Sequence, residues 1–145
     1  MLDFNITLPA SKERIVEYST DYKNFKRFLP DQIKNIEILT ENEEGTTTQE
    51  TLFVTTISKK EFVQKSLHTI VDENHLKTII LEGPAKNSII NTIFEEVPSG
   101  TKVVITIDLK LSLKYKILQP FVKKFYKMIF TSILYRMNNE ALKNE

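Results

Sequence analysis

Three short polar turns divide the middle of the chain into segments in which apolar and polar residues alternate. The turns are ENEEG at 41–45, DEN at 72–74 and PSG at 98–100. Extended segments flank them over 33–57, 61–83 and 88–111. Alternation with a period of two is typical of strands with one buried face, and short polar turns join antiparallel neighbours. The pattern therefore predicts six antiparallel strands arranged as three hairpins.

The first thirty residues predict one more strand and two short helices. Leu2, Phe4, Ile6 and Leu8 alternate with polar residues, as in a half-buried strand. Ser11 is a suitable N-cap for a helix over 12–22. A second short helix, over 23–29, ends before a proline at position 30.

The C-terminal segment predicts a long helix. Pro120 suits the first helical turn, and about 24 residues follow it, which would span ~36 Å at 1.5 Å per residue. Lys123, Lys127, Thr131 and Asn138 fall on the face expected to be exposed, and Phe121 is expected to be buried with the apolar residues. The apolar stripe at helical spacing consists of Val122, Phe125, Tyr126, Ile129, Ile133 and Met137.

Length and composition place the chain among ordinary globular proteins. Its 145 residues predict a single domain over 1–145, and a net charge of +1 gives no general attraction to DNA. There is no cysteine, no signal-peptide pattern at the start and no run of ~20 apolar residues. The expected location is the cytoplasm. The order of strand, two helices, six strands and long helix predicts the α+β class.

Most catalytic and cofactor motifs are missing. The three glycines each fall at a predicted turn or strand end, so no glycine-rich phosphate loop is present. His68 and His75, the two histidines, lack a helical metal-ligand spacing, and no serine has a nucleophile-elbow context. We therefore predict no metal site, no cofactor and no catalytic residue.

Several strings, in this order, resemble one protein family. They are TDYKNFKRFLPDQIKNIEIL, KKEFVQKSLHTI, LEGPAKNSIINTIFEEV and VITIDLKLSLKYKILQPFVKKFYKMIF. The chain resembles the START-like, or Bet v 1-like, superfamily, and most closely the coenzyme-Q-binding branch of the polyketide cyclase and lipid transport family. That resemblance implies a helix-grip fold, in which a curved seven-stranded antiparallel sheet wraps around the C-terminal helix and leaves a cavity.

The resemblance also implies a function. Such proteins hold a hydrophobic molecule such as a quinone, a lipid, an isoprenoid or a polyketide, and non-enzymatic binding or transport is the expected function. A polyketide cyclase or dehydratase is one alternative, with His68 and Glu82 as the nameable acid or base. A ribosome-associated module is the other, because one relative is described as blocking the association of ribosomal subunits.

Three positions depart from the family pattern towards smaller side chains. Ala85, Ser88 and Thr92 stand where the family has Phe, Leu and Trp, whereas Phe94 is kept. If this segment faces inward, the pocket is wider and more polar than usual, which speaks against ubiquinone itself. Refilling of the space by other large residues is the competing interpretation.

One strand of the expected site has two candidate inner faces. The face with Val63, Leu67 and Val71 is the more apolar, but the resemblance places Phe62 inside, which would bring Gln64, Ser66 and His68 into the cavity. The residues expected to contact the ligand are Phe62, Ser66, His68, Ile90, Thr92, Phe94, Ile105, Ile107, Leu109, Phe125, Ile129 and Ile133.

Basic residues gather near the start of the final helix. No acidic residue occurs between Leu109 and Asn139, and aromatic residues lie among the cations. A solvated helix face explains this pattern, and so does docking on an anionic membrane or on ribosomal RNA. The membrane contact would use Lys114, Lys116, Lys123, Lys124 and Lys127.

Overall fold

The chain folds into one sheet and one long helix, with shorter helices at both ends of the sheet. The computed structural model describes residues 1–53 and 61–144, so Ile57, the expected end of the third strand, lies outside the described residues. The order of elements predicted from the sequence is confirmed. The elements are β1 (Leu2–Leu8), α1 (Lys12–Thr20), η1 (Tyr22–Phe28), β2 (Ile33–Asn42), β3 (Gly45–Phe53), β4 (Glu61–Asp72), β5 (His75–Glu82), β6 (Ile89–Val97), β7 (Gly100–Asp108), η2 (Leu113–Leu118) and α2 (Gln119–Lys143).

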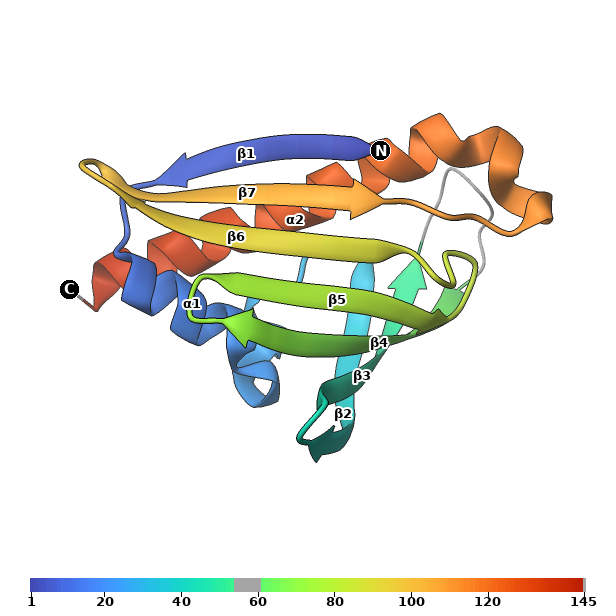
Figure 1. Cartoon of the computed structure of the whole chain (residues 1–145), viewed down its shortest axis with the longest axis horizontal. Helices are drawn as coiled ribbons and strands as arrows, with labels where there is room; N and C mark the ends of the chain where they lie inside the picture. The colour runs from blue at the N-terminus through green and yellow to red at the C-terminus, as the bar shows by residue number, and fades with distance from the viewer. Residues whose placement is uncertain (54–60, 145) are drawn as a thin grey trace.

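The strands form a seven-stranded antiparallel sheet in the order β1-β7-β6-β5-β4-β3-β2. The first strand joins the sheet beside the last, with Leu2 opposite Ile107 and Leu8 opposite Thr101. Figure 1 shows α2 crossing one face of the sheet, while β2 and β3 run steeply across the direction of β6 and β7. This curvature around one helix is the helix-grip architecture, so the expected fold class is confirmed.

Two hairpin turns depend on glycine. Gly45 and Gly100 have φ angles of +137° and +140°, which residues with a side chain rarely adopt. A Cβ atom at Gly45 would lie 2.1 Å from the carbonyl oxygen of His68, and one at Gly100 would lie 2.0 Å from that of Leu8. Each glycine therefore lets one turn lie directly against the backbone of a neighbouring segment.

The face of α2 that packs on the sheet is mostly the predicted stripe. Val122, Phe125, Tyr126, Ile129, Ile133 and Met137 are all buried. Two predictions for this helix are wrong. Phe121 is 53% exposed, and Asn138, placed on the exposed face, is buried because its Oδ1 accepts a 2.9 Å hydrogen bond from the backbone N–H of Ala10.

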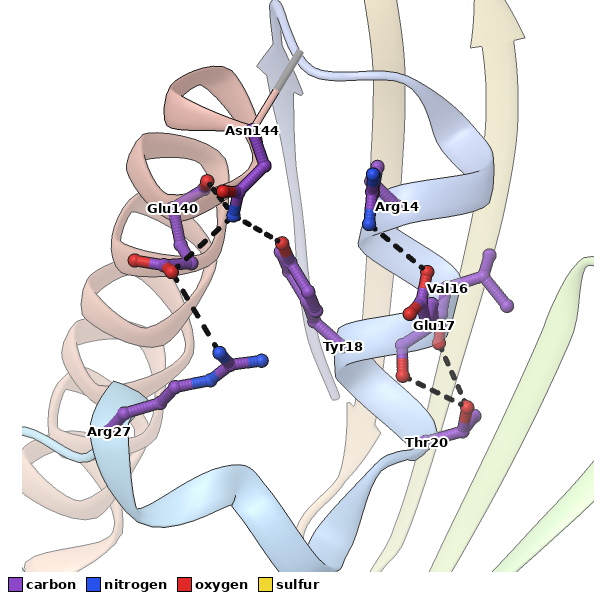
Figure 2. A network of polar contacts seen from close by, with 8 residues as sticks. All are labelled: Arg14, Val16, Glu17, Tyr18, Thr20, Arg27, Glu140 and Asn144. Carbon is purple, nitrogen blue, oxygen red and sulfur yellow. Dashed lines mark hydrogen bonds and ion pairs between the residues drawn. The ribbon is translucent and has the colours of Figure 1, made fainter.

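The short N-terminal helices are fastened to the end of α2 by polar contacts (Figure 2). The Arg27 guanidinium lies 3.8 Å from the Glu140 carboxylate, and Asn144 Nδ2 donates a 3.4 Å hydrogen bond to the Tyr18 hydroxyl. Arg27 also stacks over the Tyr18 ring at 4.9 Å. These contacts hold α1 and η1 against the helix that the sheet surrounds.

Candidate functional site

A cavity of about 130 Å³ lies between the sheet and α2. A single buried water needs only ~10–15 Å³ on the same kind of measure, and an apolar cavity of ~150 Å³ is known to bind benzene. The space is therefore suited to a molecule about the size of one aromatic ring. Its walls come from α1, η1, β2 to β7 and α2, so almost every element of the fold contributes.

Most of the cavity wall is apolar. The sheet contributes Ile90, Phe94 and Ile105, all nearly fully buried, because alternate residues of β6 and β7 point to the same face. The helix contributes Ile129 and Ile133, four residues apart and hence on one side of α2. The remaining apolar lining residues are Phe25, Leu29, Ile33, Ile36, Leu52, Leu76, Phe130, Leu134 and Met137.

Polar side chains of β3 to β6 form one part of the cavity lining, which we call the polar wall. Glu50 comes from β3, and Gln64, Ser66 and His68 come from β4. The sequence left the inner face of β4 open between two sets of residues. Gln64 and Ser66 are buried, whereas Val63, on the more apolar face, is 52% exposed. Thr78 and Thr92 complete the polar wall.

A chain of hydrogen bonds leads through His68 to Glu50. The Thr48 hydroxyl donates to Glu50 Oε1 at 3.1 Å, so it must accept from the N–H of His68 Nε2, 2.8 Å away. His68 Nδ1 then accepts from the Thr78 hydroxyl at 2.8 Å. Burial lowers the pKa of the His68 imidazole from 6.5 to about 4, so this ring is neutral at physiological pH.

Glu50 is the one carboxyl group among the described residues that line this cavity. Burial raises the pKa of Glu50 from 4.5 to about 7, although hydrogen bonds from Ser66 and Thr48 oppose the rise. Its Oε1 lies 3.9 Å from His68 Nε2, but the neutral imidazole supplies no opposite charge. Its Oε2 is buried and has no hydrogen-bond partner within residues 1–53 and 61–144.

Tyr22 of η1 brings a second unsatisfied polar atom to the same wall. Its ring stacks on the His68 ring with centroids 4.6 Å apart. Its buried hydroxyl has no hydrogen-bond partner in the part of the chain that the structure describes. Burial, assisted by the nearby Glu50 carboxylate, raises the pKa of the Tyr22 hydroxyl, which therefore stays protonated. The cavity thus presents an acidic oxygen and a phenolic O–H that the protein leaves unpaired.

A smaller cavity of about 40 Å³ adjoins the first. Both are lined by Leu52, Gln64 and Tyr126, so these residues form the wall between them. The Tyr126 hydroxyl donates a 3.0 Å hydrogen bond to Gln64 Oε1 across this wall. Phe62, Ala85 and Phe125 line the smaller cavity, together with Pro84, Leu111, Tyr115 and Val122.

The residues expected from the sequence to contact a ligand separate into three groups. Ser66, His68, Ile90, Thr92, Phe94, Ile105, Ile129 and Ile133 line the larger cavity. Phe62 and Phe125 line the smaller one instead. Ile107 and Leu109 line neither: both are buried in the core, and Leu109 follows the end of β7 at Asp108. Their role in binding stays a prediction.

The three small residues of the family comparison have different surroundings. Thr92 lines the larger cavity and Ala85 the smaller one. Ser88 lines neither, because its hydroxyl donates to the backbone C=O of Lys110 and accepts from the N–H of the same residue, at 3.1 and 2.8 Å. The hypothesis that Ser88 widens the pocket is therefore wrong, since this side chain joins two segments of backbone.

Glu82, the acid named for the enzyme alternative, is not in the cavity. It is exposed on β5 and forms an ion pair of 3.1 Å with Lys65. The acid that does line the cavity, Glu50, was not identified from the sequence. The structure places it there through the pairing of β3 with β4, which sets Glu50 opposite Gln64 and Thr48 opposite Ser66.

The fold and the cavity between sheet and helix define the chain as a protein with the START-like, or Bet v 1-like, helix-grip fold. Neither a family model nor a curated protein matches the sequence. Similar solved structures include TTHA0849 of Thermus thermophilus, with 19% identity, 99% of this chain and 98% of that chain covered, and a TM-score of 0.82. The superfamily resemblance is thereby confirmed for the fold, while the likeness to its coenzyme-Q-binding branch stays a prediction.

Two further structural neighbours carry descriptive names. A START superfamily protein from Mycobacterium smegmatis has 16% identity, covers 99% of this chain and 98% of its own, and has a TM-score of 0.78. The Zhui aromatase/cyclase from a Streptomyces species has 14% identity, covers 98% of this chain and 93% of its own, and has a TM-score of 0.81. At these identities the likeness extends to the fold alone.

Proposed function

We propose that this protein binds and carries a compact hydrophobic molecule in the larger cavity. The observation that carries the proposal is the cavity itself, about 130 Å³ of space with mainly apolar walls. Protein interiors are normally close-packed, so a space of this size between the sheet and α2 is available to a ligand. A ligand that binds only the folded protein there stabilises it by mass action.

The names of the structural neighbours agree with this proposal. A START superfamily protein and an aromatase/cyclase share the fold. Lipid, isoprenoid quinone and polyketide-like molecules are the ligand classes expected from the sequence resemblance. The shared feature of these classes is a large apolar surface, which the isoleucine and phenylalanine walls match.

The first test is native mass spectrometry of gently purified protein, followed by extraction with organic solvent. We expect a mass increment that disappears on extraction. Thr92→Phe adds a ring to the wall of the cavity and should abolish the mass increment. Thr106→Phe is the control, because it makes the same change at a partly exposed residue of β7 that pairs with Asn91 of β6. Equal ligand content in both variants, or none in the wild type, would contradict the proposal.

Catalysis is the second candidate function, and one observation favours it. Glu50, with its pKa raised by burial to about 7, and the neutral His68 both line the cavity, and such perturbed groups are frequent in active sites. A cyclase or dehydratase would release a molecule different from the one supplied. Mass analysis of bound ligand before and after incubation separates the two functions, because a carrier returns its ligand unchanged.

We further propose that the η2 end of the molecule docks on anionic membranes to exchange the ligand. Leu113 and Ile117 are 85% and 86% exposed, and Phe121 is 53% exposed. Leu113 and Ile117 belong to η2 and Phe121 to the first turn of α2, so the three exposed apolar side chains lie close together along the chain, within residues 113–121. Lys114, Lys116 and Lys124 nearby are exposed, and each cation near an anionic surface contributes ~1 kcal/mol. Among the described residues, no helix has the length and apolarity to cross a bilayer.

Vesicle co-sedimentation tests this docking surface. Ile117→Asp should weaken binding to phosphatidylglycerol-containing vesicles by about tenfold or more, because one buried isoleucine contributes ~1.5–3 kcal/mol. Ile70→Asp is the matched control, since Ile70 is 64% exposed on β4, whose last residues lie at the opposite end of the sheet from η2 (Figure 1). Binding to ribosomes but not to vesicles would favour the ribosome-associated alternative instead.

A further inference from the structure

The polar wall of the larger cavity leaves two buried oxygen atoms without partners among the described residues. Glu50 is 8% exposed and lines the cavity, and its carboxyl group receives hydrogen bonds from Thr48 and Ser66. Among the described residues, none is paired with Glu50 Oε2 or with the buried Tyr22 hydroxyl of η1. Unpaired buried polar atoms are rare in folded proteins, because each costs the free energy of its lost hydration. Two of them in one cavity wall call for a ligand that supplies the missing hydrogen bonds.

No cation among the described residues lines this cavity. The titratable groups that line it are Tyr22 of η1, Glu50 of β3, His68 of β4 and Tyr126 of α2. His68 is neutral and its two nitrogens are already paired with Thr48 and Thr78. Tyr126 already donates to Gln64. None of the described residues therefore supplies a charge or a hydrogen bond to Glu50 Oε2.

We propose that the ligand is a ring-sized phenol or alcohol whose hydroxyl group lies between Glu50 and Tyr22. A hydroxyl is both donor and acceptor, so it donates to Glu50 Oε2 and accepts from the Tyr22 O–H. The apolar body of the ligand then packs on Ile90, Ile105 and Ile129. This inference rests on the proposed function, since it names the chemical class that the same cavity binds.

The geometry discriminates against two neighbouring ligand classes. A carboxylate ligand would bring a second negative charge beside Glu50 in a site that holds no cation among its described residues. At about pH 8, where Glu50 with its pKa of about 7 is mostly ionised, an oxidised quinone has only carbonyl acceptors and leaves this carboxylate unpaired. A hydroquinone, a phenol or a short isoprenoid alcohol avoids both penalties.

Calorimetric titration with three matched probes tests the proposal: 4-ethylphenol, 4-ethylanisole and ethylbenzene. We expect 4-ethylphenol to bind the wild type about tenfold or more tightly than either other probe, because only it donates a hydrogen bond to Glu50. Glu50→Gln and Tyr22→Phe should each reduce that preference. Glu82→Gln, which removes an exposed carboxylate paired with Lys65, should leave it unchanged.

The outcomes separate this inference from the proposed function. Equal binding of all three probes would overturn the hydroxyl site while leaving a hydrophobic cavity that binds ligands. Binding of none would overturn both. The wild-type comparison alone decides between these results, so the test does not depend on the folding of any variant.

A pH series adds an independent test. Since the hydroxyl donates to the ionised carboxylate, affinity for 4-ethylphenol should rise by up to about tenfold between about pH 6 and about pH 8. His68, with its pKa lowered by burial to about 4, does not titrate in this range. The role of Glu50 would be overturned if the affinity of the wild type for 4-ethylphenol did not change with pH. It would also be overturned if the affinity of Glu50→Gln rose with pH as in the wild type.

Discussion

Replacement of Glu50 by glutamine should stabilise the protein, and the gain should depend on pH. Burial raises the pKa of Glu50 in the folded protein from 4.5 to about 7. Folding therefore favours the neutral form of the Glu50 carboxyl group. The contribution of Glu50 to the free energy of unfolding is fully present below about pH 4.5 and is lost as pH rises through 7. Glutamine keeps the size of the side chain and never ionises.

The magnitude follows from the size of the pKa change. A rise from 4.5 to about 7 corresponds to about 3 kcal/mol of unfolding free energy at pH values well above 7. The free energy of unfolding of Glu50→Gln should thus exceed that of the wild type by up to about 3 kcal/mol near pH 8 and equal it near pH 4. For a chain of this length that difference raises the melting temperature by roughly 6–12 °C.

His68 makes the free energy of unfolding depend on pH in the opposite direction, over nearly the same pH range. Burial lowers the pKa of His68 in the folded protein from 6.5 to about 4, so the unfolded chain takes up a proton first as pH falls. Stability is therefore lost as pH falls from 6.5 towards 4. In the wild type the effects of Glu50 and His68 on stability partly cancel as pH changes. In Glu50→Gln, the pH dependence of stability should show the effect of His68 alone.

Urea unfolding followed by far-ultraviolet circular dichroism, from about pH 4 to about pH 8, measures both effects; the chain has no tryptophan for fluorescence. Glu82→Gln is the control, because this carboxylate is exposed. If the Glu50→Gln and wild-type stabilities differ by a constant amount across this range, the burial of an unpaired carboxyl group in the cavity is refuted.

Three further substitutions test the packing, each by the urea midpoint of unfolding. Gly100→Ala should cost at least about 2 kcal/mol, since its Cβ would lie 2.0 Å from the Leu8 carbonyl oxygen; a neutral result would contradict the turn geometry. Met137→Ala should cost ~2–5 kcal/mol because the side chain is 1% exposed, and a loss under ~1 kcal/mol would indicate looser packing. Asn138→Leu should cost ~1–3 kcal/mol by leaving the Ala10 N–H unpaired, and a stabilised variant would count against that hydrogen bond.

The sheet was predictable because its determinants are local. Each of the three hairpins has alternating residues on both sides of a short turn, and the turn fixes which strands are neighbours. The observed hairpins β2–β3, β4–β5 and β6–β7 follow those turns. The pairing of β1 with β7 brings the first strand of the chain beside the last and makes β1 an edge strand. No turn specifies this pairing; the family resemblance implied only that the sheet has seven strands.

Helical periodicity predicts on which side of α2 each side chain lies, but it does not predict which other segments of the protein lie beside that side chain. Phe121 is 53% exposed at the first turn of α2, where Phe53 at the end of β3 approaches it across a surface groove and does not cover it. Asn138 is polar and yet buried, because the backbone of Ala10 approaches at that level and offers a donor. Neither approach is encoded in the spacing of residues along one helix.

The polar wall could not be derived from composition or alternation. In β3 the inward residues include Thr48, Glu50 and Leu52, and the outward set of Thr47, Gln49 and Thr51 is no more polar. Without a hydrophobic contrast, periodicity does not choose a face. Only the register with β4, which sets Glu50 opposite Gln64, brings this carboxyl group into the interior.

The wall between the two cavities also limits how long a guest can be. It is held by one hydrogen bond, from the Tyr126 hydroxyl to Gln64, between a space of about 130 Å³ and one of about 40 Å³. A tail that passes from the larger space into the smaller one would separate Tyr126 from Gln64 and leave both buried polar groups unpaired, at about 1–3 kcal/mol each. A single substitution at Tyr126 would therefore change the length of molecule that fits.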